Sequence, residues 1–263
     1  MQGWDNVLTR LTITMKNESD IKLNYNISSL LHGALIEKID PEYSDILHQS
    51  TIKPFSQYSE FDGNTIKWTI NSLNEEATTR IGKMMLNDEG DSIFLTHKNL
   101  SLKILEKGFV KKSYDELLDE TYFKDGSRFI NLQFVTPTAF KSQGNFVFFP
   151  ELRHIFQSLI SKYDYCSKDS AIGSEELLEH ITTNSVMTRY NLRSTYFHLE
   201  GIKVPSFMGW ITIKINGPQA MVNLANLLFA FGEYSGVGVK NALGMGGIRL
   251  LRESSKGGRV RND

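Results

Sequence analysis

The stretch Val7-Leu-Thr-Arg-Leu-Thr-Ile-Thr-Met15 alternates apolar with polar side chains and is rich in threonine. A period of two over this length predicts a half-buried β-strand. A helix is expected next, because apolar side chains then recur at helical spacing, at Ile27, Leu30, Leu31, Ala34 and Leu35. Asn26 stands where an N-cap residue is expected, and Pro41 follows just beyond the end of this helix.

Three further strands are expected in the first hundred residues. Residues 52–61 and 65–70 are strand candidates, and the Asp62-Gly63-Asn64 segment between them is typical of a hairpin turn. Residues 100–105 alternate apolar and polar side chains again. The two hairpin strands are therefore predicted to pair with each other directly.

A second helix is predicted between the hairpin and the last of these strands. Ser72 followed by Glu75 matches the capping box that opens a helix, which we extend through Leu86. The order is then β-α-β-β-α-β, a ferredoxin-like unit. In such a unit both helices cover one face of an antiparallel sheet, and the other face is left for a ligand, a partner or a second domain.

The second half of the chain repeats this order with longer insertions. Its expected elements are a strand at 128–135, an apolar segment at 146–149, a helix opened by Pro150, β-rich stretches at 186–199 and 204–215, a helix from Pro218 to Phe231 ended by Gly232, and a strand at 247–251. Pro205 and Gly209 indicate an edge strand or a bulge in the second β-rich stretch. The predicted fold class is α+β, with two tandem ferredoxin-like units.

Four segments follow from this division of the chain. We predict an N-terminal domain at 1–107, a connecting segment at 108–127, a C-terminal domain at 128–253 and a basic tail at 254–263. The C-terminal domain contains a glycine-rich loop at 236–247.

The composition bounds the class of protein. The 263 residues are 40% hydrophobic, and 29 basic against 30 acidic side chains give a net charge of −1, which excludes a disordered polymer. Cys166 has no second cysteine to pair with, so a reducing compartment is expected. No apolar run approaches the roughly 18 residues of a membrane span. We therefore expect a cytoplasmic, globular protein with no membrane partner.

The glycine-rich loop is the strongest local signal. It reads Gly236-Val-Gly-Val-Lys-Asn-Ala-Leu-Gly-Met-Gly-Gly247, with five glycines in twelve residues between a predicted helix and a predicted strand. Such backbone takes positive φ or lets another group approach closely, and successive free N–H groups in it would bind a phosphate. A tight loop that merely turns sharply is the alternative. The loop matches neither a Walker A motif nor a dinucleotide fingerprint.

Charge favours the phosphate interpretation. From Gly236 to the C-terminus there are six basic and two acidic side chains, a local charge of +4 in a nearly neutral protein. Such an excess beside a glycine-rich loop indicates a polyphosphate or a nucleic-acid backbone as ligand. The six basic residues are Lys240, Arg249, Arg252, Lys256, Arg259 and Arg261.

A Gly-x-Gly-x5-Gly-x-Gly loop at the end of two tandem ferredoxin-like units resembles the CRISPR-associated repeat-processing endoribonucleases of the RAMP superfamily. The matching positions are Gly236, Gly238, Gly244 and Gly246, with apolar Val237 and Met245 inside the pairs. The segment 134–140, followed by Pro150 and the helix around 156–159, is also similar to the second domain of that family. The fold implied is of the RAMP type.

The resemblance implies a metal-independent endoribonuclease that cleaves CRISPR repeat RNA during precursor crRNA maturation. The 2′-hydroxyl attacks the adjacent phosphorus and leaves a 2′,3′-cyclic phosphate and a 5′-hydroxyl. This chemistry needs a base, an acid and a cation beside the phosphorane. It implies no metal ion and no cofactor.

Family position implies that His32, on the first helix, moves a proton as base or acid. Independently, His32 falls about 60° beyond the Leu35 edge of the apolar stripe, outside the core contact. Lys38 is the cation candidate, and Tyr25 would orient the phosphate or the nucleophile. The alternatives are a surface histidine, a lysine snorkelling along the stripe and a tyrosine used only in packing.

The RNA-binding residues expected from the loop and from basic positions at element ends form one set. They are Gly236, Gly238, Lys240, Asn241, Gly244, Gly246, Arg249, Lys22, Arg128 and Lys141. The expected partner is CRISPR repeat RNA. Other CRISPR effector-complex subunits and a second copy of the chain are left open as partners.

Two other functions remain open from the sequence. One is a non-catalytic RNA-binding RAMP subunit of a CRISPR effector complex, in which His32 would be structural. The other is an enzyme that binds a mononucleotide in the glycine-rich loop, although no Mg²⁺-holding Ser, Thr or Asp is placed beside it.

Overall fold

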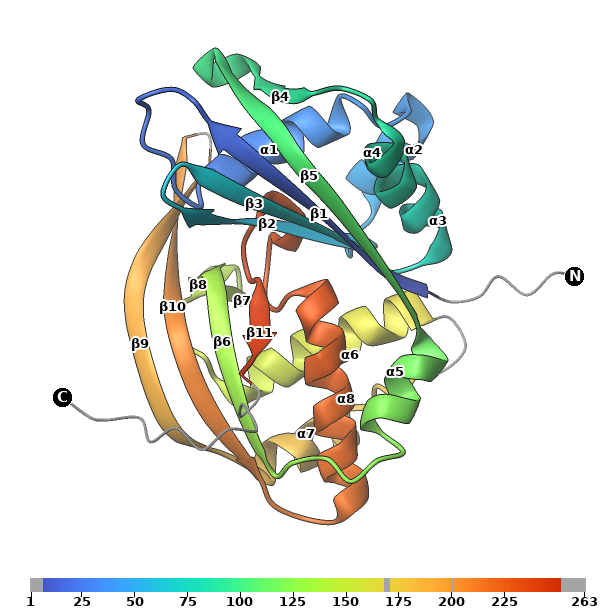
Figure 1. Cartoon of the computed structure of the whole chain (residues 1–263). Coiled ribbons are helices and arrows are strands. Elements are labelled where there is room, and N and C mark those ends of the chain that lie inside the picture. Colours follow the sequence, from blue (N-terminus) through green and yellow to red (C-terminus); the bar gives the residue numbers. More distant parts are fainter. Residues whose placement is uncertain (1–6, 168–170, 200, 252–263) are drawn as a thin grey trace, which may run out of the picture.

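The computed structural model describes residues 7–167, 171–199 and 201–251 of the chain (Figure 1). The first ferredoxin-like unit contains a sheet covered by helices. Its elements are β1 (Val7–Asn17), α1 (Ile27–Ile36), α2 (Pro41–Gln49), β2 (Phe55–Asp62), β3 (Thr65–Ser72), α3 (Glu75–Ala77), a π-helical turn (Thr78–Lys83), α4 (Met84–Asn87), β4 (Ser92–Leu95) and β5 (Leu100–Ser113).

The remaining elements form the second unit and its connection to the first. They are α5 (Tyr114–Thr121), β6 (Phe129–Thr138), β7 (Phe140–Ser142), β8 (Asn145–Val147), α6 (Leu152–Ser167), α7 (Glu175–Thr183), β9 (Ser185–Leu199), β10 (Ile202–Ile215), α8 (Gln219–Ser235), a 3₁₀ turn (Asn241–Leu243) and β11 (Ile248–Leu250).

Strand order confirms the predicted fold class. In the described part of the chain, the first sheet has the order β2-β3-β1-β5-β4 and the second has the order β11-β6-β10-β9. Without the added edge strand β4, each sheet places its last strand beside its first, followed by its third and second. Neighbouring strands are antiparallel throughout these two sheets. This is the ferredoxin-like arrangement, used twice.

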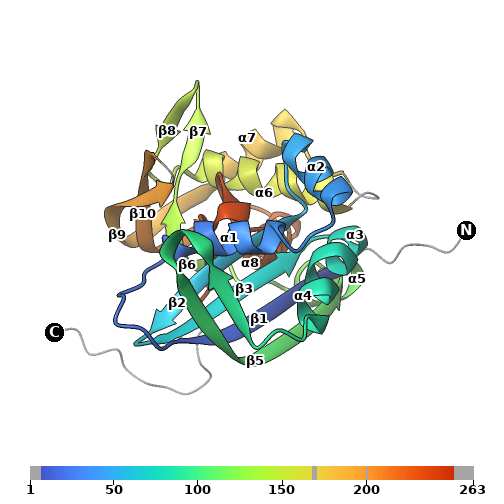
Figure 2. The same cartoon turned by 90° about the horizontal axis from the view of Figure 1, so that it is seen from above.

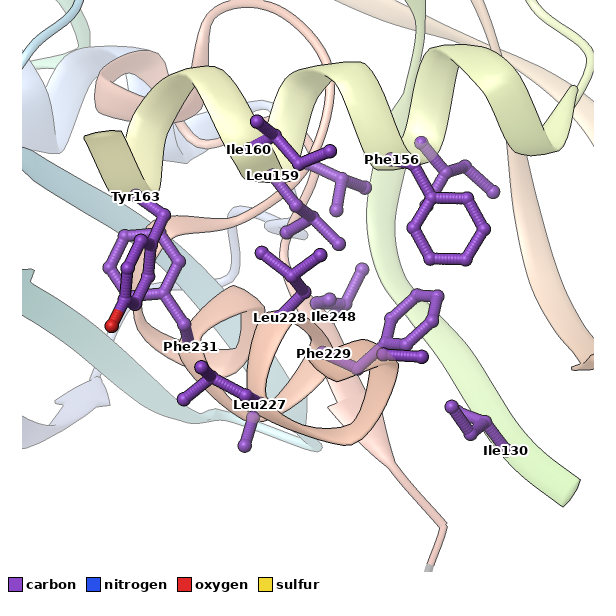
Figure 3. Packing of buried hydrophobic residues seen from close by; sticks show 14 of the residues in the cluster. Ile130, Phe156, Leu159, Ile160, Tyr163, Leu227, Leu228, Phe229, Phe231 and Ile248 are labelled. Atoms are coloured by element: carbon purple, nitrogen blue, oxygen red, sulfur yellow. The ribbon is translucent and has the colours of Figure 1, made fainter. Parts of the chain in front are cut away.

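Each unit buries its own apolar core. In the second unit, α6 and α8 pack on each other and on the sheet through aromatic and branched side chains, among them Phe156, Leu159, Leu228 and Phe229 (Figure 3). In the first unit the core lies under α1 and α2 around the fully buried Trp68. Aromatic burial on this scale contributes the largest share of core stability.

The open face of the first sheet is covered by the second unit. Arg10 on β1 donates to the Glu233 carbonyl and lies 4.6 Å over the Tyr234 ring. Ser56 on β2 donates to the Tyr234 carbonyl. Of the three uses expected for this face, the second domain is the one observed over these residues.

The first hairpin forms at the predicted turn, and Gly63 has a φ of +57°. The helix after it begins differently from the prediction. Ser72 is the last residue of β3, and Asn74 is the N-cap, with its side chain accepting from the Ala77 N–H at 2.8 Å. The predicted Ser72 capping box is therefore wrong, because Ser72 is used in the sheet.

The predicted connection at 108–127 contains regular structure. β5 continues through Ser113, and Ser113 with Glu116 forms the capping box of α5. Helix α2 was not predicted from the sequence; Asp40 caps it and Pro41 opens it. The division at 107 and 128 stays a prediction.

Of two glycines singled out in the second unit, Gly232 acts differently from expectation and Gly209 forms one of its two predicted features. Gly232 lies inside α8, and the helix ends at Gly236 instead. A Cβ at Gly232 would lie 2.7 Å from Ile248 Cδ1, so this glycine permits close packing on β11 rather than helix termination. Gly209 does form a bulge, with φ +132°, but β10 lies between β6 and β9 and is not an edge strand.

The predicted basic tail at 254–263, which contains Lys256, Arg259 and Arg261, lies outside the described residues, as does Arg252. Among the helices that are described, none is long and apolar enough to cross a membrane.

Candidate active site

Helix α1 presents its apolar side to the core and His32 beside it. Ile27, Leu31 and Leu35 are buried, as the sequence predicted. His32 is half-buried at the edge of this stripe, with its ring parallel to that of Phe55 at a centroid distance of 6.1 Å and an angle of 8°. The stacked phenylalanine limits ring rotation, so the imidazole has a defined direction.

Burial makes His32 a weak base. Its pKa is lowered to about 4, mainly by desolvation, and Coulombic interactions with His48 and, more weakly, with Lys53 lower it further. A hydrogen bond with the Ala242 backbone acts in the opposite direction. The imidazole is therefore neutral at pH 7. Its Nδ1 is buried and makes no hydrogen bond within the described residues.

A cation whose charge acts on His32 is Lys53, which the sequence pattern did not single out. Its ammonium donates to the carbonyls of Leu47, His48 and Ser50 at the end of α2. These contacts hold the charge at the C-terminal, negative end of that helix, where a cation is stabilised. Burial lowers the pKa of Lys53.

The glycine-rich loop lies against α1. In Figure 2 it is the red segment that follows α8. A Cβ on Gly244 would lie 2.2 Å from Ser28 Cβ, so only glycine lets the loop approach the helix this closely. Ala242 at the tip of the loop reaches His32. The loop and His32 are thus brought together across about two hundred residues of sequence.

The backbone of the loop is largely used within the protein. The N–H groups that donate to internal acceptors are those of Gly236, Val237, Gly238, Val239, Leu243, Gly244, Met245, Gly246 and Gly247. The expected concavity of free N–H groups is therefore wrong for these positions. Of the predicted RNA-binding glycines, all four have positive φ, which explains their identity by turn geometry.

Gln57 links the loop, α1 and the sheet. Its side chain is fully buried and donates to the carbonyls of Ser28 and Ala242, both at 2.9 Å. It accepts in turn from Trp68 Nε1 at 2.8 Å. The nitrogen and the oxygen of this buried amide are thus both paired, which stabilises one arrangement of loop and helix.

The other two predicted catalytic residues do not join His32. Lys38 forms an ion pair with Asp88 at 2.7 Å. Tyr25 lies at the start of α1, where it hydrogen-bonds Thr195 at 2.7 Å and stacks on Phe197 of β9. These two contacts of Tyr25 connect the start of α1 with the β9–β10 ribbon.

The predicted RNA-binding side chains fall into two groups. Arg249 pairs with Glu60, Arg128 donates to the carbonyls of Ile215 and Gly217, and Asn241 points into its own loop. Arg128 thus lies at the start of α8, one helix length of about 25 Å from the loop that follows α8. The side chains of Lys22, Lys141 and Lys240 make no hydrogen bond or ion pair with the described residues. Lys240 is the one that belongs to the loop beside His32.

One of the residues missed from the sequence carried a readable signal. Lys162 contacts the loop from α6 and stands on the apolar stripe of that helix, three residues after Leu159 and four before Cys166. A lysine on a core-facing stripe needs buried acceptors, which is the signal that was overlooked. Gln57 and Lys53 carried no comparable signal.

No group of three or more potential metal-ligating side chains, counted among His, Cys, Asp and Glu, occurs in the described residues. The six histidines are distributed over both units.

Comparisons with known proteins agree on one family. A family model described as "CRISPR-associated endoribonuclease Cas6" matches residues 132–248. The "CRISPR-associated endoribonuclease Cas6" of Streptococcus thermophilus is 34% identical over 228 residues, which cover 83% of this chain and 89% of that protein. A protein of the same description from Mycobacterium tuberculosis is 29% identical over 252 residues, which cover 92% of this chain and 78% of that protein.

Solved structures show the same fold. A Thermus thermophilus Cas6 superposes with a TM-score of 0.74 at 21% identity, covering 95% of this chain and all of that one. A Cas6 product complex gives a TM-score of 0.77 at 20% identity, covering 94% and 100%.

Proposed function

Because the chain belongs to the family of CRISPR-associated Cas6 endoribonucleases, we propose that it cleaves the repeats of precursor CRISPR RNA at the site built around His32. The observation that carries this assignment is a neutral, half-buried imidazole that stacks on the Phe55 ring and meets the Ala242 backbone, with the charge of Lys53 acting on it. A neutral imidazole and a nearby cation are the groups that RNA transesterification uses.

In the proposed reaction the nucleophile belongs to the RNA itself, so no water attacks phosphorus and no metal or cofactor is needed. The ribose 2′-oxygen forms a bond to the adjacent phosphorus while the bond from phosphorus to the 5′-oxygen breaks. The proton of the 2′-hydroxyl passes to the His32 imidazole, and the departing 5′-oxygen takes up a proton from solvent. The products are a 2′,3′-cyclic phosphate and a 5′-hydroxyl. Lys53 would stabilise the extra negative charge on the phosphorane.

The neutral state of His32 at pH 7 favours the role of base over that of acid. At pH 7 an imidazole with a pKa of about 4 is almost entirely neutral and can accept the 2′-hydroxyl proton. We expect protonation of His32 to have no effect on kcat/KM between about pH 5.5 and 7.5. Protonation should lower kcat/KM only as the pH approaches 4. If His32 acted as the acid, kcat/KM would instead fall about tenfold per pH unit across that range. A pH–rate profile of repeat cleavage distinguishes the two.

Lys53 and Lys38 are expected to differ when each is replaced by methionine. Lys53→Met removes the charge proposed to stabilise the phosphorane, so single-turnover cleavage should slow by about tenfold to a hundredfold. Lys38→Met breaks an exposed pair with Asp88, which is worth little, so the rate should stay within about twofold. Equal loss in both variants would contradict the assignment of Lys53. Circular dichroism of both variants checks that α2 remains folded.

The decisive experiment incubates the purified protein with its own CRISPR repeat RNA in EDTA. We expect one cut, with a 2′,3′-cyclic phosphate on the upstream fragment and a 5′-hydroxyl on the downstream one. Binding without any product at high enzyme concentration would support the alternative, a non-catalytic RNA-binding subunit of an effector complex. Cleavage that requires a divalent ion would overturn the proposed metal-independent mechanism.

A further inference from the structure

Lys162, on α6, is bound to the glycine-rich loop by hydrogen bonds. Its ammonium donates to the carbonyls of Gly236 at 3.0 Å and Gly238 at 3.2 Å, and to the Asn241 side-chain oxygen. An ammonium has three donors, and here each of them has an acceptor on the same loop. Lys162 therefore connects the start of the loop with its middle.

Asn241 extends the hydrogen bonds made by Lys162 to the other side of the loop. Its amide nitrogen donates to the carbonyls of Val237 at 2.9 Å and Met245 at 3.0 Å. A Cβ on Gly236 or Gly246 would lie 2.7 or 2.4 Å from that nitrogen, so the asparagine fills the space that these glycines leave. The loop is closed around the Asn241 side chain, which Lys162 orients through its oxygen.

The residue after Asn241 is the one that contacts His32. The Ala242 backbone hydrogen-bonds the His32 imidazole, and its carbonyl also accepts from Gln57. Asn241 and Ala242 are consecutive in the chain, so one peptide unit joins the residue that Lys162 holds to the residue that contacts His32. A change in the position of Asn241 is therefore passed directly to the group that faces the imidazole.

We infer that Lys162 is a positioning residue for cleavage, which sets the orientation of His32 by fixing the glycine-rich loop through Asn241. The inference rests on the proposed function of His32. It assigns a role in the chemistry to a side chain that does not reach the reacting atoms itself.

Desolvating the charge of Lys162 beside the loop costs free energy. None of the ion pairs among the described residues includes Lys162. Desolvation lowers its pKa to about 7, with a small opposing effect from Cys166. A partly buried ammonium balanced only by dipoles stabilises the fold poorly, but it does order the carbonyls around it. This agrees with a role in geometry rather than in stability.

The test replaces Lys162 by methionine, which keeps the length of the side chain and removes all three donors. The matched control is Lys107→Met, because Lys107 also donates to three carbonyls, those of Met85, Leu86 and Asp88, at the end of α4. We expect Lys162→Met to slow single-turnover cleavage at saturating enzyme at least tenfold. RNA affinity, measured in the cleavage-deficient His32→Ala background, should change less than threefold. Lys107→Met should keep the wild-type rate.

Nitrogen-15 NMR of the imidazoles provides a readout that does not depend on RNA. The His32 signal is identified by its absence from the His32→Ala spectrum. In Lys162→Met we expect its nitrogen shifts to move and its pKa to fall, because the Ala242 hydrogen bond raises that pKa. Should Lys162→Met fail to fold, Lys162→Gln keeps a neutral donor and is measured in the same way.

The outcomes separate the two claims. An unchanged cleavage rate and an unchanged His32 signal in the variant would overturn the inference while leaving the proposed function intact. Equal losses of affinity and rate would also overturn it, since Lys162 would then act in RNA binding. A shifted His32 signal in a chain that never cleaves its repeat would leave the contact path supported and the proposed function refuted.

Discussion

Replacing His32 by alanine is expected to slow repeat cleavage by a factor of about 10² to 10⁴, the range that one positioned general base contributes. The imidazole is the only titratable side chain that faces Phe55 and the Ala242 backbone together, among the contacts described for this site. RNA affinity should remain within a few-fold, because the basic side chains that remain still attract the phosphate backbone. Single-turnover cleavage and filter binding of the same RNA measure the two effects.

A matched control separates chemistry from general damage. His180 is an exposed histidine on α7 of the other unit, so His180→Ala should cleave at the wild-type rate. His32→Gln keeps a polar side chain on α1 but no imidazole, and it should be as slow as the alanine variant. Rapid cleavage by either His32 variant would remove this residue from the mechanism.

Adding one methyl group to Gly246 is expected to have the second large effect. A Cβ there would lie 1.9 Å from the Val237 carbonyl oxygen and 2.4 Å from Asn241 Nδ2, at a φ of +70° that disfavours alanine. The loop must open to relieve these overlaps and so loses the hydrogen bonds that close it. We expect Gly246→Ala to lower the free energy of unfolding by about 3 kcal/mol or more, and cleavage to fall with the displaced loop.

Gly144→Ala is the control for the backbone conformation alone. Gly144 also has a positive φ, of +83°, but a Cβ at this position would have no atom within 4 Å. The substitution should therefore cost only the left-handed strain, about 1–2 kcal/mol, and leave cleavage unchanged. Urea unfolding of both variants gives the comparison. A Gly246→Ala protein as stable as Gly144→Ala would mean that the loop is not closed as described.

The structure explains the glycines of the loop differently from the sequence. The spacing predicted that free N–H groups of the loop would bind a phosphate, whereas most of these groups donate within the protein. Glycine is needed because Asn241, Val237 and Ser28 approach the loop backbone too closely for any Cβ. The loop packs between the two units, and it places Ala242 against His32.

Periodicity in the sequence was sufficient for most of the fold. Alternation in β1, the apolar stripe of α1 and the hairpin turn at Gly63 are local patterns, and each corresponds to the structure. Local patterns succeed here because amphipathic strands and helices must place their apolar sides on a common core. The β-α-β-β-α-β order then leaves few ways to arrange the sheet, and the chain uses the same one twice.

The partners of charged and polar side chains came only from the tertiary structure. Lys38, six residues from His32 in sequence, pairs with Asp88, whereas the charged side chains that lower the pKa of His32 include Lys53, twenty-one residues away. Arg249 was assigned to RNA, but Glu60 of the other unit neutralises it. Neither pairing could be predicted, because electrostatic interactions depend on distance in space and on desolvation, and periodicity reports neither. Patterning therefore determined which faces are buried and which family the chain resembles, whereas the packing of the two units decided what surrounds His32.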